Sequence, residues 1–94
     1  MSLPNPTYGA VSVSTNPTVI LASNPQRRGC LIVNNETSAT IYLGFDTSLT
    51  TANGLPLAAG ASLNNSDDSA LWRGVIYGIV GSATADVRYW EWIA

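Results

Sequence analysis

The sequence predicts an all-β domain: a single antiparallel β-sandwich or jelly-roll-like barrel of about seven to eight short strands. Val, Ile, Leu and Thr gather in short runs, and Asn-Pro, Asn-Gly and Gly-Ser pairs mark turns between these runs. Apolar and polar residues alternate within several runs, which is the period of a half-buried strand. The 94 residues are enough for one domain, and no long stretch has the period of a helix.

The N-terminal part contains a leader and the first two expected strands. Residues 1–9, with two prolines, predict an extended or mobile leader, and residues 10–94 predict the β-sandwich domain. Val11 and Val13 alternate with serines and indicate the first strand. The apolar run 18–22 indicates a buried second strand, because an Asn-Pro step precedes it and another follows it.

The clearest local signal in the sequence is that of a hairpin. Residues 30–33 form an apolar strand, residues 34–38 have turn chemistry, and residues 40–46 form the returning strand. Three apolar residues of the returning strand share one face: Ile41, Leu43 and Phe45. We therefore expect these two strands to pair with each other.

Shorter elements are expected in the middle of the chain. Residues 55–57 indicate an edge strand or an extended connector, because the proline among them cannot donate to a ladder. Residues 61–63 could add another short strand. Asp67 or Asp68 could cap one helical turn over residues 70–72, which a following glycine would end.

The last two strands are expected over residues 75–80 and from Thr84 onward. Three residues of the final strand face one way: Ala85, Val87 and Tyr89. Trp90 and Trp92, however, lie at the positions that would face the other way, so the alternation of apolar and polar residues shifts near the end of the strand. Either a bulge shifts the register, or both faces of this strand are covered. The second alternative requires a covering surface beyond the domain's own core.

The composition argues against catalysis. The chain contains no histidine and no lysine, and its single cysteine cannot supply a zinc site or an internal disulfide. No nucleophile elbow or phosphate-binding glycine loop is present. We therefore expect a binding or structural protein with no enzymatic activity, no cofactor and no metal. Cys30 lies in an apolar run, so we expect a buried, inert thiol.

The charge balance is equally informative. Four arginines and six acidic residues give a net charge of −2, and only 11% of the residues are charged. This balance predicts no nucleic-acid partner and no membrane partner. A weakly charged exterior suits a protein that packs against neighbours. The N-terminal residues do not resemble a signal peptide, so we expect synthesis in a reducing cytosol.

One segment has the oxygen-rich chemistry of a calcium loop. Residues 64–68 read Asn-Asn-Ser-Asp-Asp, but they lack the glycine and the distal glutamate of an EF-hand. A solvated turn is therefore the expected structure here. The acidic residues likewise form no pattern that would select a catalytic pair.

Six residues are candidates for an interface with another protein: Arg27, Arg28, Trp72, Tyr89, Trp90 and Trp92. The adjacent arginines could dock on an acidic surface, or they could be a solvated strand start. Aromatic residues are enriched in interface cores, although packing in the domain core is the ordinary role of any one of them. Stacked aromatics would also suit a sugar-binding platform.

Most of the chain, over residues 24–92, resembles small β-rich virion proteins of tailed phages. Four segments carry the resemblance: residues 24–35 (NPQRRGCLIVNN), 39–44 (ATIYLG), 53–63 (NGLPLAAGASL), and the last part from 76–79 (IYGI) to 85–88 (ADVR). The loop over residues 64–74, which contains a tryptophan, is longer and more aromatic than the family pattern.

The resemblance implies a β-sandwich or jelly roll on the virion exterior, frequently trimeric. The expected function is that of a capsid decoration or cement protein, which stabilises the phage head by binding across subunits of the major capsid protein. A tail, fibre or head–tail adaptor protein and a carbohydrate-binding module are the alternatives.

Overall fold

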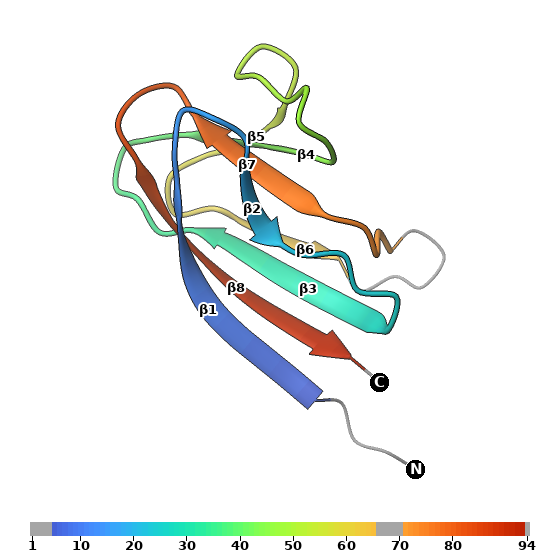
Figure 1. Ribbon diagram of the computed structural model, residues 1–94. Coiled ribbons are helices and arrows are strands. Elements are labelled where there is room, and N and C mark those ends of the chain that lie inside the picture. Colours follow the sequence, from blue (N-terminus) through green and yellow to red (C-terminus); the bar gives the residue numbers. More distant parts are fainter. Residues whose placement is uncertain (1–4, 66–70, 94) are drawn as a thin grey trace.

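Eight β-strands in two antiparallel sheets make up the structure, a computed structural model that describes residues 5–65 and 71–93 (Figure 1). The strands are β1 (Asn5–Val13), β2 (Thr18–Leu21), β3 (Arg27–Asn34), β4 (Ile41–Gly44), β5 (Leu55–Leu57), β6 (Ser62–Asn65), β7 (Ile76–Val80) and β8 (Ala85–Ile93). The described residues contain no helix. Of the expected helical turn, residues 71–72 are not helical, and its other residues lie outside the described part.

The strand order is that of a jelly roll. One sheet has the order β1-β8-β3-β6 and the other has the order β2-β7-β4-β5. Each strand of the first half pairs with its counterpart in the second half, so the chain is one long ribbon rolled into two layers. The predicted all-β, two-sheet fold class is confirmed.

The expected hairpin over residues 30–33 and 40–46 is wrong. β3 pairs with β6 and β8, whereas β4 pairs with β5 and β7 in the other sheet. Cys30 and Ile32 therefore contribute to the core from one sheet, and Ile41 and Leu43 contribute from the other. A period of two specifies which face of a strand is buried, but it does not select the neighbouring strand. Phe45 lies beyond the end of β4 and is exposed.

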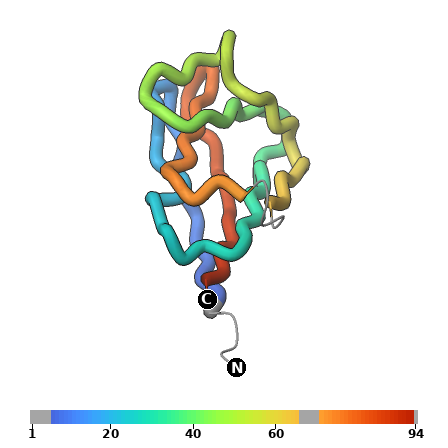
Figure 2. The backbone as a smooth tube through the Cα atoms, turned by 90° about the vertical axis from the view of Figure 1, so that its right-hand side faces the viewer, coloured from blue at the N-terminus to red at the C-terminus, as the bar shows by residue number. Residues whose placement is uncertain are grey.

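The first strand is longer than the sequence indicates. β1 begins at Asn5, so residues 5–9 of the expected leader belong to the sheet and pair continuously with β8. Pro6 is compatible with this pairing because β1 is an edge strand. Figure 2 shows β1 and β8 running side by side to one end of the molecule, which has principal extents of 45 × 25 × 17 Å.

The core lies between the two sheets and is built from the inward-facing residues of both. Its buried members are Val13, Ile20, Leu21, Cys30, Ile32, Ile41, Leu43, Leu57, Ile76, Val80, Ala85 and Val87. At Gly78 an added Cβ would lie 2.7 Å from Cδ1 of Ile20 on the neighbouring strand β2 and 3.3 Å from Cγ2 of Val13 in the other sheet. The alternation predicted for residues 85–89 is confirmed, since Ala85 and Val87 are buried and Tyr89 packs against the core.

The outer faces of the two sheets differ. The loop between β4 and β5 folds back over the outer face of its sheet, and Leu49 is buried there. The side chain of Leu49 takes the space that a Cβ at Gly44 or Gly54 would occupy. No described loop does the same for the outer face of the β1-β8-β3-β6 sheet, where Tyr8 and Trp90 remain exposed.

Candidate interaction face

The outer face of the β1-β8-β3-β6 sheet carries Trp90 and Trp92, the two aromatic residues that interrupt the apolar–polar alternation of the last strand. β8 pairs with β1 without interruption, so Trp90 and Trp92 share the face opposite to Tyr89. The only irregularity between β8 and β3 lies in β3, between Arg27 and Gly29. Of the two alternatives for this strand, a bulge within β8 is therefore wrong, and the end of its second face carries two indoles.

Cross-strand pairing assembles one apolar row on this face. Tyr8 of β1 and Leu31 of β3 lie on either side of Trp90. In the next row, Ala10 and Val33 flank Arg88 in the same way. Side chains directly opposite each other on neighbouring strands are in contact distance, so these rows form a continuous surface. We call Tyr8, Trp90, Leu31 and Val33, which this pairing brings together, the aromatic face.

The aromatic face is exposed to solvent. Tyr8 is 81% exposed and Trp90 is 58% exposed, while Leu31 and Val33 are half-buried. A shallow depression of about 450 Å³ is lined by Tyr8, Leu31, Val33 and Trp90 together with Arg88 and neighbouring residues of β1. Large aromatic side chains in a rimmed apolar depression are typical of a binding surface.

Arg88 and Asp86 form an ion pair beside the aromatic face. Nη2 of Arg88 donates a hydrogen bond of 2.8 Å to Oδ2 of Asp86, which also accepts one of 2.9 Å from the Asn35 amide. The Arg88 guanidinium, and then the Asn35 amide, lower the pKa of Asp86 below its ordinary value. The Asp86 carboxylate in turn raises the pKa of Arg88. The rim of the face is therefore polar, and the Glu36 carboxylate adjoins this pair by accepting a hydrogen bond of 2.8 Å from the backbone amide of Asp86.

Two of the candidate aromatic residues are packed against glycines. A Cβ at Gly9 would lie 2.7 Å from Oη of Tyr89, and a Cβ at Gly29 would lie 2.6 Å from the Trp92 indole. These rings therefore fill space that the glycines leave open, and both residues are half-buried. Among the candidates on β8, Trp90 is the one whose ring is mainly available to a partner.

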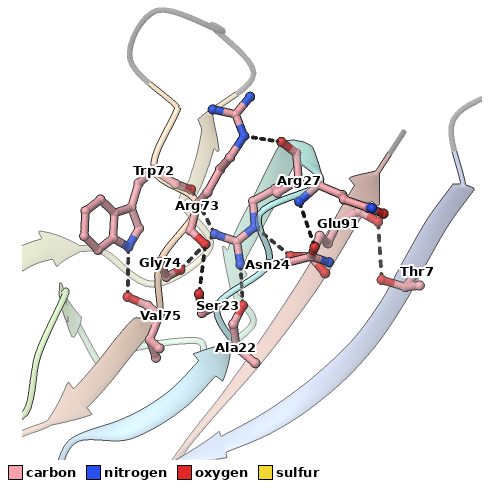
Figure 3. A network of polar contacts seen from close by, with 11 residues as sticks. Thr7, Ala22, Ser23, Asn24, Arg27, Trp72, Arg73, Gly74, Val75 and Glu91 are labelled. Atoms are coloured by element: carbon pink, nitrogen blue, oxygen red, sulfur yellow. Dashed lines mark hydrogen bonds and ion pairs between the residues drawn. The ribbon is translucent and has the colours of Figure 1, made fainter.

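Trp72 lies apart from the aromatic face. Its indole Nε1 donates to the carbonyl of Val75 at 2.9 Å, and its ring packs over Gly74. The ring centroid is 4.8 Å from that of Phe45, with the planes at 47°. Figure 3 shows this indole pointing away from the strand that carries Glu91. The structure thus brings Trp90 and Trp92 onto one face and places Trp72 elsewhere.

Arg27 is not available to a partner, which corrects the expectation that both arginines could dock on an acidic surface. Its side chain is fully buried, and Nε donates to Oε2 of Glu91 at 2.6 Å. The guanidinium also donates to the carbonyls of Trp72, Gly74 and Ala22, at 2.8, 3.0 and 2.6 Å (Figure 3). Because Glu91 shares the inward face of β8, Arg27 is drawn into the protein.

The neighbouring Arg28 is exposed, so it keeps the access to solvent that a docking role requires.

The Arg27 network also includes backbone groups: Nε of Arg73 donates to the carbonyl of Arg27 at 2.9 Å, and the backbone amide of Asn24 donates to the carbonyl of Arg73 at 2.9 Å. These contacts join the loop before β3 to the loop before β7. Their role is structural.

Two further groups that could carry chemistry are the Cys30 thiol and the oxygen-rich segment 64–68. Cys30 is buried as expected, and burial raises the pKa of its thiol, partly offset by the charge of Arg27. Within residues 5–65 and 71–93, no three His, Cys, Asp or Glu side chains lie close enough to hold a metal ion. Of the oxygen-rich segment 64–68, residues 66–68 lie outside the described part. The described chain also has no helix suited to span a membrane.

Sequence reasoning missed Tyr8, Leu31 and Val33 as members of the face. Leu31 and Val33 alternate with the buried residues of β3, and the sequence alone reads this run as a core strand. Tyr8 lay in the expected leader. Only the pairing of β1 and β3 with β8 places these residues beside Trp90. Comparisons with protein-family profiles, curated proteins and solved structures find no match.

Proposed function

We propose that the protein is a non-enzymatic virion structural protein, a capsid decoration protein of a tailed phage that binds the assembled head through the aromatic face. The observation that carries this proposal is the exposed Tyr8–Trp90 pair on a sheet whose other side is a packed core. The sequence resemblance and the small charged fraction of 11% support the same role.

The physical basis of decoration is mass action. A protein that binds the assembled shell, and not free subunits, stabilises assembly by an amount set by its concentration and affinity. Rigid aromatic side chains in a shallow depression provide contact area at little cost in conformational entropy. The neutralised Arg88–Asp86 pair at the rim brings no large repulsive field to the contact.

The test uses empty, expanded capsids of the phage that encodes the protein. We expect the purified protein to co-sediment with them at micromolar concentration and to raise their melting temperature. Trp90→Ala should weaken binding by about tenfold or more, as is usual for an aromatic hot spot. Phe45→Ala is the matched control, because Phe45 is 60% exposed and lies outside the aromatic face.

Two results would contradict the proposal. One is failure of the wild-type protein to co-sediment with its capsids. The other is equal binding by Trp90→Ala and Phe45→Ala, which would mean that the aromatic face is not the contact. Labelling of tails in electron micrographs would instead support the tail, fibre or adaptor alternative.

A carbohydrate-binding module is the second candidate function. Tyr8 and Trp90 are directly opposite each other on neighbouring strands and could stack on a sugar ring, with Arg88 as a nearby hydrogen-bond donor. A glycan array separates the two functions. Clear sugar affinity that is lost in Trp90→Ala would favour the carbohydrate-binding module.

A further inference from the structure

The four edge strands of the two sheets differ in how well they are protected from pairing with another chain. Exposed strand edges present unpaired N–H and C=O groups, and proteins commonly protect them by short length, charge, proline or irregularity. β5 has three residues and contains Pro56, and β6 has four residues. β2 has four residues, with a register shift between Val19 and Leu21.

β1 is the exception among these described edges. It has nine residues, none of them charged, and its register with β8 shows no bulge. Pro6 limits pairing near its start but leaves residues 7–13 with backbone donors and acceptors. Figure 1 shows β1 at the border of its sheet. An uncharged, regular edge of this length is an available template for β-sheet addition.

We propose that two copies of this chain pair antiparallel through β1, with the two-fold axis beside Ala10. A second copy fits this edge because antiparallel pairing about a two-fold axis is self-complementary: each copy supplies an identical free edge. Charge does not oppose this contact, because β1 has no charged residue and the nearby Arg88 and Asp86 form an ion pair.

Pairing centred on Ala10 places Tyr8 opposite Ser12 of the second copy on the outer face. The ring of Tyr8, which is 81% exposed in one copy, would cover part of the new junction. The β1-β8-β3-β6 sheet of one copy and the same sheet of the second copy would become one continuous sheet, with both aromatic faces on the same side. This arrangement predicts a dimer and not the trimer expected from the family resemblance. It does not depend on what the aromatic face binds.

The first test measures the mass of the free protein by size-exclusion chromatography with light scattering and by sedimentation equilibrium. We expect a dimer for the wild type. Ala10→Glu should raise the dimer dissociation constant by about tenfold or more, because two carboxylates would face each other at the axis. Within each copy, this Glu would lie opposite Arg88 of β8, so we expect the fold of the single chain to be retained. Ala10→Thr is the matched control and should remain dimeric.

The second test traps the contact. In a dimer centred on Ala10, the two Ala10→Cys residues are directly opposite, about 4.5–5.5 Å apart between Cα atoms, which suits a disulfide. Mild oxidation should therefore yield a covalent dimer. Ala52→Cys, exposed in the loop between β4 and β5, is the control and should yield little, and the native Cys30 is buried.

A wild-type protein that stays monomeric throughout the micromolar range overturns the β1 pairing. So does a dimer that is unaffected by Ala10→Glu and gives no disulfide through Ala10→Cys. Both tests use the protein without capsids, so their failure is separate from a failure of capsid binding.

Discussion

Removal of the Arg27 side chain should destabilise the protein far more than any ordinary surface substitution. The guanidinium is fully buried, and it donates to the Glu91 carboxylate and to the carbonyls of Trp72, Gly74 and Ala22. In Arg27→Ala, the Glu91 carboxylate, which is only 13% exposed, loses its counter-charge, and three carbonyls lose a donor. The substitution also leaves space where the long side chain packed.

Breaking a buried ion pair by removing one partner costs about 3–5 kcal/mol. The total stability of a domain of this kind is about 5–15 kcal/mol, so the loss is a large fraction of it. At about 4 °C or more per kcal/mol for a domain below 100 residues, the Tm should fall by at least about 12 °C. The affected contacts join β3, β8 and two loops, so the fall should be cooperative.

The measurement is urea unfolding followed by tryptophan fluorescence, with calorimetry for the Tm. Arg28→Ala is the matched control: Arg28 is adjacent and exposed, and its loss should change stability by about 0.5 kcal/mol or less. Arg27→Met combined with Glu91→Leu should recover much of the loss, since no buried charge then remains unpaired. Equal effects of Arg27→Ala and Arg28→Ala would refute the reasoning.

Three further predictions concern Asn34, Asp86 and Cys30. Asn34 is fully buried and its amide donates to the carbonyls of Ala39 and Leu57 at 2.9 Å, so Asn34→Ala should cost about 1–3 kcal/mol of unfolding free energy in urea. Because the folded state lowers the pKa of Asp86, stability from this carboxylate is present above about pH 4 and lost below it. In Asn35→Ala, NMR titration should show a higher pKa of Asp86; an unchanged value would contradict this contact. Cys30 is 1% exposed, so its thiol should react with a thiol reagent only when urea unfolds the protein; fast native-state reaction would contradict its burial.

The sequence alone determined the class of the fold and many of the buried faces. Alternation within a strand and punctuation by Asn-Pro, Asn-Gly and Gly-Ser are local signals, so they located most strands and predicted the burial of Cys30, Ala85 and Val87. The bounds of β5 were predicted at residues 55–57 because its proline and flanking turn residues act locally. The second apolar face near Trp90 was also visible as a break in phase.

Only the tertiary structure decided which strands are neighbours. The expected hairpin between residues 30–33 and 40–46 is instead a crossing between sheets, because burial fixes a face while pairing partners depend on contacts distant in sequence. The same long-range pairing buries Arg27 against Glu91 and places Tyr8 beside Trp90. Local patterns contain no information on such contacts, and these contacts define both the structural network and the aromatic face.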